Sequence, residues 1–187
     1  MRITGGGARG IPLVLPKGDA VRPATDAMRQ AVFSSIASRV PGAVFWDLFA
    51  GSGAYGLEAL SRGAAGGVFV EKSAMAAACL RRNLEAVCKS LGRAPQGLDV
   101  WNTDALTATF ATVPAADLVF IDPPYDLIEA VAPKLFDHLG AALAAKTDPV
   151  IVFEMPGETE LTPPGWTCAK RLGKGHRQPT VCFFKRA

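Results

Sequence analysis

The 187-residue sequence predicts an α/β fold: a mostly parallel, doubly wound sheet with helices on both faces and an antiparallel hairpin near the C-terminus. Short apolar runs alternate with amphipathic segments from Val44 to Glu154, the order typical of parallel βαβ units. A glycine-rich loop after the first of these runs is typical of nucleotide-binding sheets. The length suits one domain, with an N-terminal arm or hairpin (residues 1–23) before an α/β core (residues 24–187).

Hydrophobic patterning places the individual elements. Strands buried on both faces form continuous apolar runs, and we expect them at residues 44–49, 67–70, 98–101, 118–121, 149–154, 166–171 and 180–185. In helices, apolar residues recur every three or four positions. We expect helices from a cap at Thr25 or Asp26 to about residue 38, from the glycine loop to about 62, and at about 74–91 and 128–144.

The charge is distributed unevenly along the chain. Residues 1–40 carry six basic and two acidic side chains, residues 41–160 eight and fifteen, and residues 161–187 six and none. Basic ends around an acidic middle favour contact with a polyanion, although solvated charge at the termini is the plainer alternative. The candidate phosphate contacts are Arg2, Arg9, Arg22, Arg29, Lys174 and Arg177.

Several functional classes are disfavoured by the composition. No uncharged apolar run approaches the roughly 18 residues of a membrane span, and the N-terminal residues lack an apolar signal core. The four cysteines form no CxxC pair, so neither a disulfide nor a metal site is expected. We expect a soluble, cytoplasmic and monomeric protein without a metal.

The glycine loop and the acids after the next strands point to a nucleotide. Gly51, Gly53 and Gly56 have the spacing GxGxxG, which permits a tight turn and close approach of the backbone to a ligand. Glu71 ends the second predicted strand, where an acid accepts hydrogen bonds from a ribose, or alternatively caps the following helix. Asp104 follows the third strand at the same edge of the sheet.

Two enzyme classes fit this loop: dinucleotide-dependent enzymes and S-adenosylmethionine-dependent methyltransferases. Asp47, inside the strand before the loop, favours a cationic ligand, because a pyrophosphate prefers bare N–H groups and positive charge. The chain also has room for only one mononucleotide-binding half. Both observations favour S-adenosylmethionine, a single adenosine that carries a sulfonium cation.

The fourth predicted strand ends in the motif Asp122-Pro123-Pro124-Tyr125. Each proline fixes its φ angle and donates no N–H, so the backbone after the strand is stiff and presents carbonyl acceptors. Asp122 adds a carboxylate, and Tyr125 adds an aromatic face. The motif therefore predicts a slot that accepts hydrogen bonds from an NH2 group beside a stacked ring, which hydride transfer does not need.

These motifs together resemble the bacterial RsmD family, which methylates the 2-amino group of a guanine in small-subunit (16S) ribosomal RNA. The resemblance rests on RPATD (22–26), DLFAGSGAYGLEALSRGA (47–64), FVEK (69–72), NTDA (102–105) and FIDPPY (120–125). It implies a Rossmann-like class I methyltransferase fold with seven strands. It also implies 16S rRNA as the partner, within the small ribosomal subunit or an assembly intermediate.

The resemblance also implies the roles of the site residues. Asp47, Gly51, Ser52 and Gly53 would line the methionine end of S-adenosylmethionine, Glu71 would hold the ribose and Asp104 the adenine amino group. Further cofactor contacts are Phe49, Lys72, Ala105 and Asp122. Asp122, Pro123, Pro124 and Tyr125 would bind the target amine. The alternatives are amino methylation of DNA adenine N6 or protein glutamine N5, and a non-catalytic RNA-binding module with the same fold.

Overall fold

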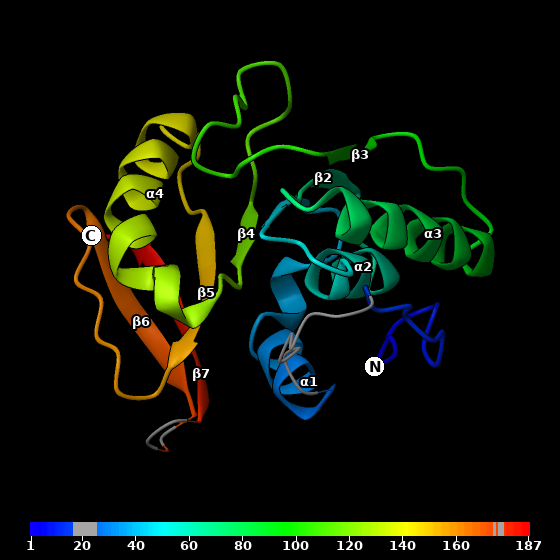
Figure 1. Ribbon diagram of the computed structural model, residues 1–187, viewed down its shortest axis with the longest axis horizontal. Helices are drawn as coiled ribbons and strands as arrows, with labels where there is room; N and C mark the ends of the chain where they lie inside the picture. The colour runs from blue at the N-terminus through cyan, green and yellow to red at the C-terminus, as the bar shows by residue number, and fades with distance from the viewer. Residues whose placement is uncertain (17–25, 174, 176–177) are drawn as a thin grey trace.

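The computed structural model describes residues 1–16, 26–173, 175 and 178–187 (Figure 1). In these residues the chain forms a seven-stranded sheet of order β3-β2-β1-β4-β5-β7-β6. The strands are β1 (Val44–Leu48), β2 (Gly66–Val70), β3 (Leu98–Trp101), β4 (Leu118–Ile121), β5 (Val150–Pro156), β6 (Trp166–Leu172) and β7 (Pro179–Arg186). The first five pair in parallel, whereas β7 runs antiparallel between β5 and β6. The predicted fold class is confirmed.

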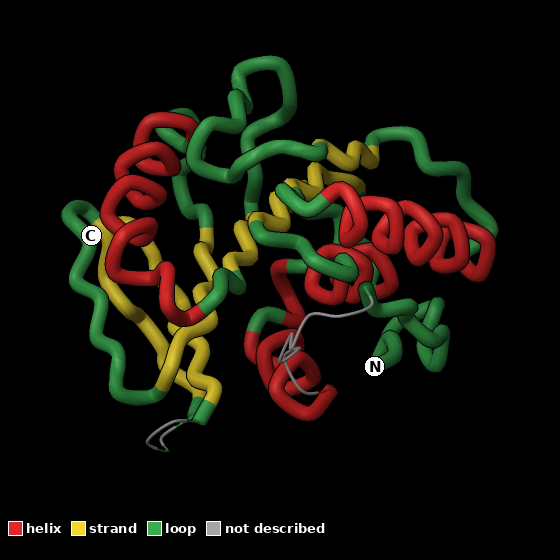
Figure 2. The backbone as a smooth tube through the Cα atoms, in the orientation of Figure 1, coloured by secondary structure: helices red, strands yellow, loops and turns green. Residues whose placement is uncertain are grey.

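Helices cover both faces of the sheet (Figure 2). They are α1 (Asp26–Ser35), α2 (Ala54–Ser61), α3 (Ala74–Ser90) and α4 (Ile128–Ala142), with short 3-10 turns η1 (Ala37–Arg39) and η2 (Tyr125–Leu127). Apolar residues of α1, α2 and α3 pack on one face of the sheet, and those of α4 pack on the other. The first helix was expected to reach residue 38, but it ends at Ser35 and continues after Ile36 as η1.

The face that carries α4 is completed by a loop between β3 and β4. Phe110 from this loop stacks on Trp46 of β1, with ring centroids 4.0 Å apart and planes 18° from parallel. Both side chains are buried. A packed aromatic pair therefore covers part of this face of the sheet.

The N-terminal residues form a hairpin that packs onto α2. The Ile3 N–H donates to the Ile11 carbonyl (3.0 Å), and Arg2 pairs with Pro12 in an antiparallel bridge. Ile3 and Ala8 are fully buried. The hairpin is thus part of the core.

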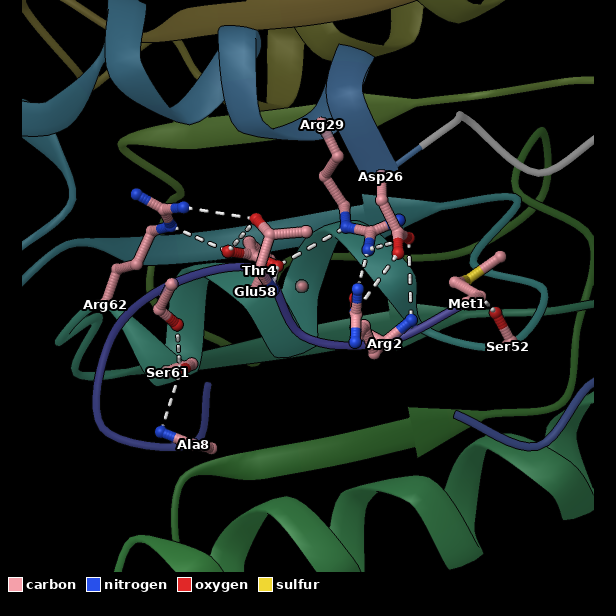
Figure 3. A network of polar contacts seen from close by, with 12 residues as sticks. Met1, Arg2, Thr4, Ala8, Asp26, Arg29, Ser52, Glu58, Ser61 and Arg62 are labelled. Carbon is pink, nitrogen blue, oxygen red and sulfur yellow. Dashed lines mark hydrogen bonds and ion pairs between the residues drawn. The ribbon is translucent and has the colours of Figure 1, made fainter. Parts of the chain in front are cut away.

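Buried polar groups of α2 hold this hairpin in place (Figure 3). The Glu58 carboxylate accepts from the Thr4 N–H (2.7 Å), the Thr4 hydroxyl (2.8 Å) and the Arg62 guanidinium (2.8 Å). The Ser61 hydroxyl accepts from the Ala8 N–H (2.9 Å). Gly6 must be glycine, because its φ is +78° and a Cβ would lie 1.9 Å from the Ser61 carbonyl oxygen.

Two negative findings apply to the described part of the chain. None of its helices is long and apolar enough to cross a membrane. No group of three or more His, Cys, Asp or Glu side chains within it could hold a metal ion, and its cysteines, Cys79, Cys88, Cys168 and Cys182, are free thiols.

Candidate active site

A cleft of about 890 Å³ lies at the carboxyl ends of the central parallel strands. Open α/β sheets bind their ligands at this edge, where the connections after neighbouring strands diverge. Eleven residues singled out from the sequence line it: Phe49, Gly51, Ser52, Glu71, Lys72, Asp104, Ala105, Asp122, Pro123, Pro124 and Tyr125. Asp47, in β1, and Gly53, in the glycine loop, are not among the residues that line the cleft.

The glycine loop turns sharply between β1 and α2. Phe49 has a φ of +61°, and among the described residues it is the one non-glycine with a positive φ. Strain of this kind is concentrated at functional sites. Gly53 has a φ of +83°, and a Cβ there would lie 2.1 Å from Leu80 of α3. Close packing of the loop on α3 therefore requires a glycine at position 53.

Asp47 lies beneath the loop with only 2% of its surface exposed. Its carboxylate accepts a 2.8 Å hydrogen bond from the Gly56 N–H in the first turn of α2. Desolvation, with a contribution from the charge of Glu71, raises the pKa of Asp47 to about 8. The prediction that Asp47 lines the ligand site is corrected: this side chain fixes α2 against β1 from below.

Glu71 joins the end of β2 to the glycine loop. One carboxylate oxygen accepts from the Gly51 N–H at 2.8 Å, and the other accepts from the Ser73 N–H at 2.6 Å. Asn102, after β3, donates to the carbonyls of Glu71 (2.8 Å) and Lys72 (3.0 Å). The rim formed by β1, β2 and β3 is therefore a connected set of hydrogen bonds.

Lys72 and Asp104 form an ion pair at the cleft, 2.9 Å between Nζ and Oδ2. The other Asp104 oxygen accepts from the Leu106 N–H at 3.0 Å. The hydrogen bonds from Lys72 and Leu106 lower the pKa of Asp104, so its carboxylate stays ionised at neutral pH. An exposed pair of this kind contributes about 0–1 kcal/mol to stability, so a ligand can readily displace the lysine.

The Asp-Pro-Pro-Tyr motif forms the opposite border of the cleft. Pro123 is buried, Pro124 is exposed, and Tyr125 begins the turn η2. Desolvation, followed by the charges of Glu154 and Asp47, raises the pKa of Asp122 well above its ordinary value. A carboxyl group that is both accessible from a cleft and strongly perturbed in pKa is characteristic of an active site.

Three carboxyl groups lie on one face of three neighbouring strands. Phe45 and Phe120 mark this face in β1 and β4, since both pack with the helices α1, α2 and α3. Side chains alternate along a strand, so Asp47 in β1, Asp122 just after β4 and Glu154 in β5 project to the same side. Glu154 accepts a 2.8 Å hydrogen bond from the Tyr55 hydroxyl of α2.

The candidate phosphate contacts differ in their exposure to solvent. Arg2 and Arg9 of the hairpin are exposed. Arg29 is fully buried and forms ion pairs with Asp26 (2.9 Å) and Glu58 (3.4 Å), as Figure 3 shows. A buried guanidinium held by two carboxylates cannot reach a phosphate, so that assignment is corrected. Arg22, Lys174 and Arg177 lie outside the described residues.

Sequence reasoning missed two groups of residues at the site. The first is Glu154 with Tyr55; an acid that follows an apolar run in β5 repeats the pattern of Asp122 after β4, and this signal was present. The second is the segment of Leu15 and Pro16, which lines the cleft. It is held by buried Asn83, which accepts from the Val14 N–H (2.8 Å) and donates to its carbonyl (2.9 Å). No sequence pattern indicates this long-range contact.

Comparisons with known proteins agree with this geometry. A family model described as "Conserved hypothetical protein 95" matches residues 1–184. The ribosomal RNA small subunit methyltransferase D of Escherichia coli (strain K12) is 37% identical over 125 residues, which cover 67% of this chain and 60% of that protein. The protein of the same name from Haemophilus influenzae is 30% identical over 179 residues, 94% of this chain and 89% of that protein.

Structural comparison extends the likeness to the whole chain. The solved structure of the Escherichia coli protein yhhF has a TM-score of 0.79 and 29% sequence identity, and the match covers 100% of this chain and 97% of that one. By fold, by the order of its motifs and by these relatives, the chain belongs to the RsmD family, the family of ribosomal RNA small subunit methyltransferase D.

Proposed function

We propose that this protein uses S-adenosylmethionine to methylate the exocyclic N2 amino group of a guanine in 16S rRNA, within the small ribosomal subunit or an assembly intermediate. Family membership and the names of the relatives support the reaction and the substrate class. The observation that carries the proposal is the shared cleft. The Asp122–Tyr125 motif and the glycine loop border one cavity, so a bound amine lies beside a nucleotide-sized site.

The cleft suits S-adenosylmethionine in size and in polar groups. Its volume of about 890 Å³ lies within the range of about 300–1,000 Å³ that is typical of small-molecule sites. Gly51 and Ser52 would hold the methionine portion, Glu71 the ribose hydroxyls and Asp104 the adenine amino group. When bound, the cofactor supplies an electrophilic methyl group on a sulfonium centre.

The Asp-Pro-Pro-Tyr motif binds the substrate amine in this proposal. The guanine is splayed out of its stack, as enzymes that act on a base require. The Asp122 carboxylate and the Pro123 carbonyl accept hydrogen bonds from its two N–H groups and direct the nitrogen lone pair toward the cofactor site. Stacking of the ring on Tyr125 contributes about 1–3 kcal/mol.

Asp122 also receives a proton. The methylated nitrogen carries a positive charge and loses one N–H proton to reach the neutral product. Burial and the neighbouring carboxylates raise the pKa of Asp122, which makes its ionised form a better proton acceptor than an ordinary aspartate. Alignment of the reacting groups supplies the larger share of the acceleration, roughly 7–11 kcal/mol for well-positioned reactants.

Arg2 and Arg9, the exposed cations of the hairpin, are the proposed phosphate contacts among the described residues. The hairpin also reaches the cofactor cleft, since the Ser52 hydroxyl of the glycine loop lies 3.6 Å from the Met1 sulfur (Figure 3). Phosphate contacts on the hairpin would therefore position the RNA beside the site that holds the methyl donor.

The decisive experiment is methyl transfer to a defined substrate. The protein is incubated with labelled S-adenosylmethionine and small ribosomal subunits that lack the modification, and the RNA is digested and analysed by mass spectrometry. We expect N2-methylguanosine at one site. Label in DNA adenine or in a protein glutamine, with none in rRNA, would overturn the substrate assignment, and cofactor binding without any transfer would identify a non-catalytic module.

A further inference from the structure

Glu154 takes no part in the reaction described above, yet it is a nearly fully buried carboxyl group beside one that does. In the parallel pairing of β4 with β5, Ile121 is opposite Phe153. The next residues along the two strands are Asp122 and Glu154. The slot residue and the buried acid therefore occupy equivalent positions on adjacent strands and project to the same face of the sheet.

The Glu154 side chain is held in one position by Tyr55. The Tyr55 hydroxyl donates a 2.8 Å hydrogen bond to it. Tyr55 is itself buried, and its ring stacks on Phe120 with centroids 5.5 Å apart and planes 15° from parallel. A ring packed in this way cannot turn its hydroxyl elsewhere, so the carboxylate is fixed directly beside the slot.

The groups around the two acids affect the pKa values of Glu154 and Asp122 differently. Hydrogen bonds from Tyr55 and Tyr125 and the charge of Arg29 lower the pKa of Glu154, although burial raises it overall. For Asp122, burial and the charges of Glu154 and Asp47 all raise the pKa. Across the pairing with β7, Glu154 is opposite the uncharged Val181. Two coupled buried acids do not readily ionise together, and here the environment favours charge on Glu154.

We propose that Glu154, oriented by Tyr55, is a positioning residue that acts on the methyl-transfer site through Asp122 and Tyr125. This inference rests on the proposed function, and it adds a role that the Asp-Pro-Pro-Tyr motif does not contain. In this role Glu154 carries the charge of the pair in preference to Asp122, keeps Asp122 a strong proton acceptor and holds the hydroxyl end of the stacking tyrosine.

The test is a pH titration of the Asp122 carboxyl group by carbon-13 NMR in the whole protein. Asp122→Asn identifies the resonance. Glu154→Gln keeps an acceptor for the Tyr55 hydroxyl but removes the charge, and we expect it to lower the titration midpoint of Asp122 by at least about one pH unit. The acid limb of the single-turnover rate of methyl transfer should move to lower pH by a similar amount.

A second variant, Tyr55→Phe, tests the same proposal if Glu154→Gln does not fold. Tyr55→Phe retains the stack on Phe120 and removes only the donor, so it should raise the midpoint of Glu154 and lower that of Asp122 by a smaller amount. Glu129→Gln, at an exposed position of α4, is the matched control and should leave both midpoints unchanged.

The two proposals fail in different ways. If the wild-type protein methylates rRNA but the Asp122 midpoint is the same in Glu154→Gln and Tyr55→Phe, the positioning role is wrong and the function stands. If the wild-type protein transfers no methyl group, the function is wrong, and the NMR midpoints still decide whether Glu154 controls Asp122. A buried residue with a purely structural role would change the melting temperature without moving either midpoint.

Discussion

The Glu71 carboxylate, just after β2, accepts a 2.8 Å hydrogen bond from the Gly51 N–H of the glycine loop. The acid proposed to hold the ribose thus also sets the conformation of the loop proposed to hold the methionine portion. Its second oxygen is engaged by the Ser73 N–H. The two halves of the cofactor site are consequently shaped by one side chain.

Glu71→Ala should weaken binding of S-adenosylhomocysteine by about 1.5–3 kcal/mol, the usual cost of losing hydrogen bonds to a charged group. Glu71→Gln should also weaken it, because a glutamine turns one NH2 toward a backbone N–H. Isothermal titration calorimetry measures both. Glu85→Gln, at an exposed position of α3, is the control, and equal affinity in all three variants would contradict the role of Glu71.

Asp122→Ala should reduce the methyl-transfer rate by about 10²–10⁴-fold, as expected for loss of a positioned proton acceptor. Cofactor affinity should change far less, because Asp122 acts on the substrate amine. Removal of one of three neighbouring acids also relieves repulsion, so the variant should not be less stable than the wild type. Single-turnover rates, calorimetry and urea unfolding separate these effects, and equal losses in rate and cofactor affinity would defeat the assignment.

Gly56→Ala should destabilise the protein by about 1–3 kcal/mol, the usual cost of overpacking. A Cβ at Gly56 would lie 2.3 Å from Phe69 and 2.7 Å from Phe45, two ring atoms buried between α2 and the sheet. Gly140 is the matched control because it also lies in a helix, α4, and a Cβ there meets nothing within 4 Å. Gly140→Ala should stabilise by up to about 1 kcal/mol. Urea unfolding of both variants provides the comparison.

Asp47→Asn should become more stabilising as the pH rises. The pKa of Asp47 is raised to about 8 in the folded protein, so between pH about 4 and 8 the native state holds a proton that the unfolded chain has released. The stability contributed by this group is complete below pH about 4 and is lost as the pH rises through 8. Asparagine retains an acceptor for the Gly56 N–H and does not titrate.

The difference in unfolding free energy between Asp47→Asn and the wild type should therefore grow with pH within this window, by up to about 1.4 kcal/mol per pH unit. Urea unfolding at pH 5, 6, 7 and 8 measures it. A difference that is constant with pH would show that Asp47 is ionised throughout.

Arg9→Ala should weaken RNA binding, whereas Arg29→Ala should lower the stability of the fold. Arg9 is exposed, so its loss should leave stability within about 0.5 kcal/mol and weaken RNA binding, with a shallower dependence of affinity on salt. Arg29 is buried in ion pairs, so its loss should cost about 3–5 kcal/mol of stability. Filter binding at several salt concentrations and thermal unfolding test the contrast, and an unchanged salt slope in Arg9→Ala would remove it from the RNA interface.

The sequence by itself determined the fold class and the positions of the glycine loop and the Asp-Pro-Pro-Tyr motif after their strands. These features follow from local rules: apolar runs form buried strands, glycines permit positive φ, and prolines remove donors. Such rules also placed Glu71, Asp104 and Asp122 at the carboxyl edge of a parallel sheet, because every strand of that kind ends at the same side.

Only the tertiary structure decided which charged side chains line the cleft and which are buried. Asp47 and Arg29 are both buried charged residues. The Asp47 side chain accepts from the Gly56 N–H in the first turn of α2, and Arg29 pairs with Glu58, a residue distant in the chain but adjacent in the fold. The pairing of β4 with β5 places Glu154 beside Asp122. Burial and partnership depend on long-range packing, which local patterns do not specify, and they determine whether a charge binds a ligand, stabilises the fold or shifts the pKa of its neighbour.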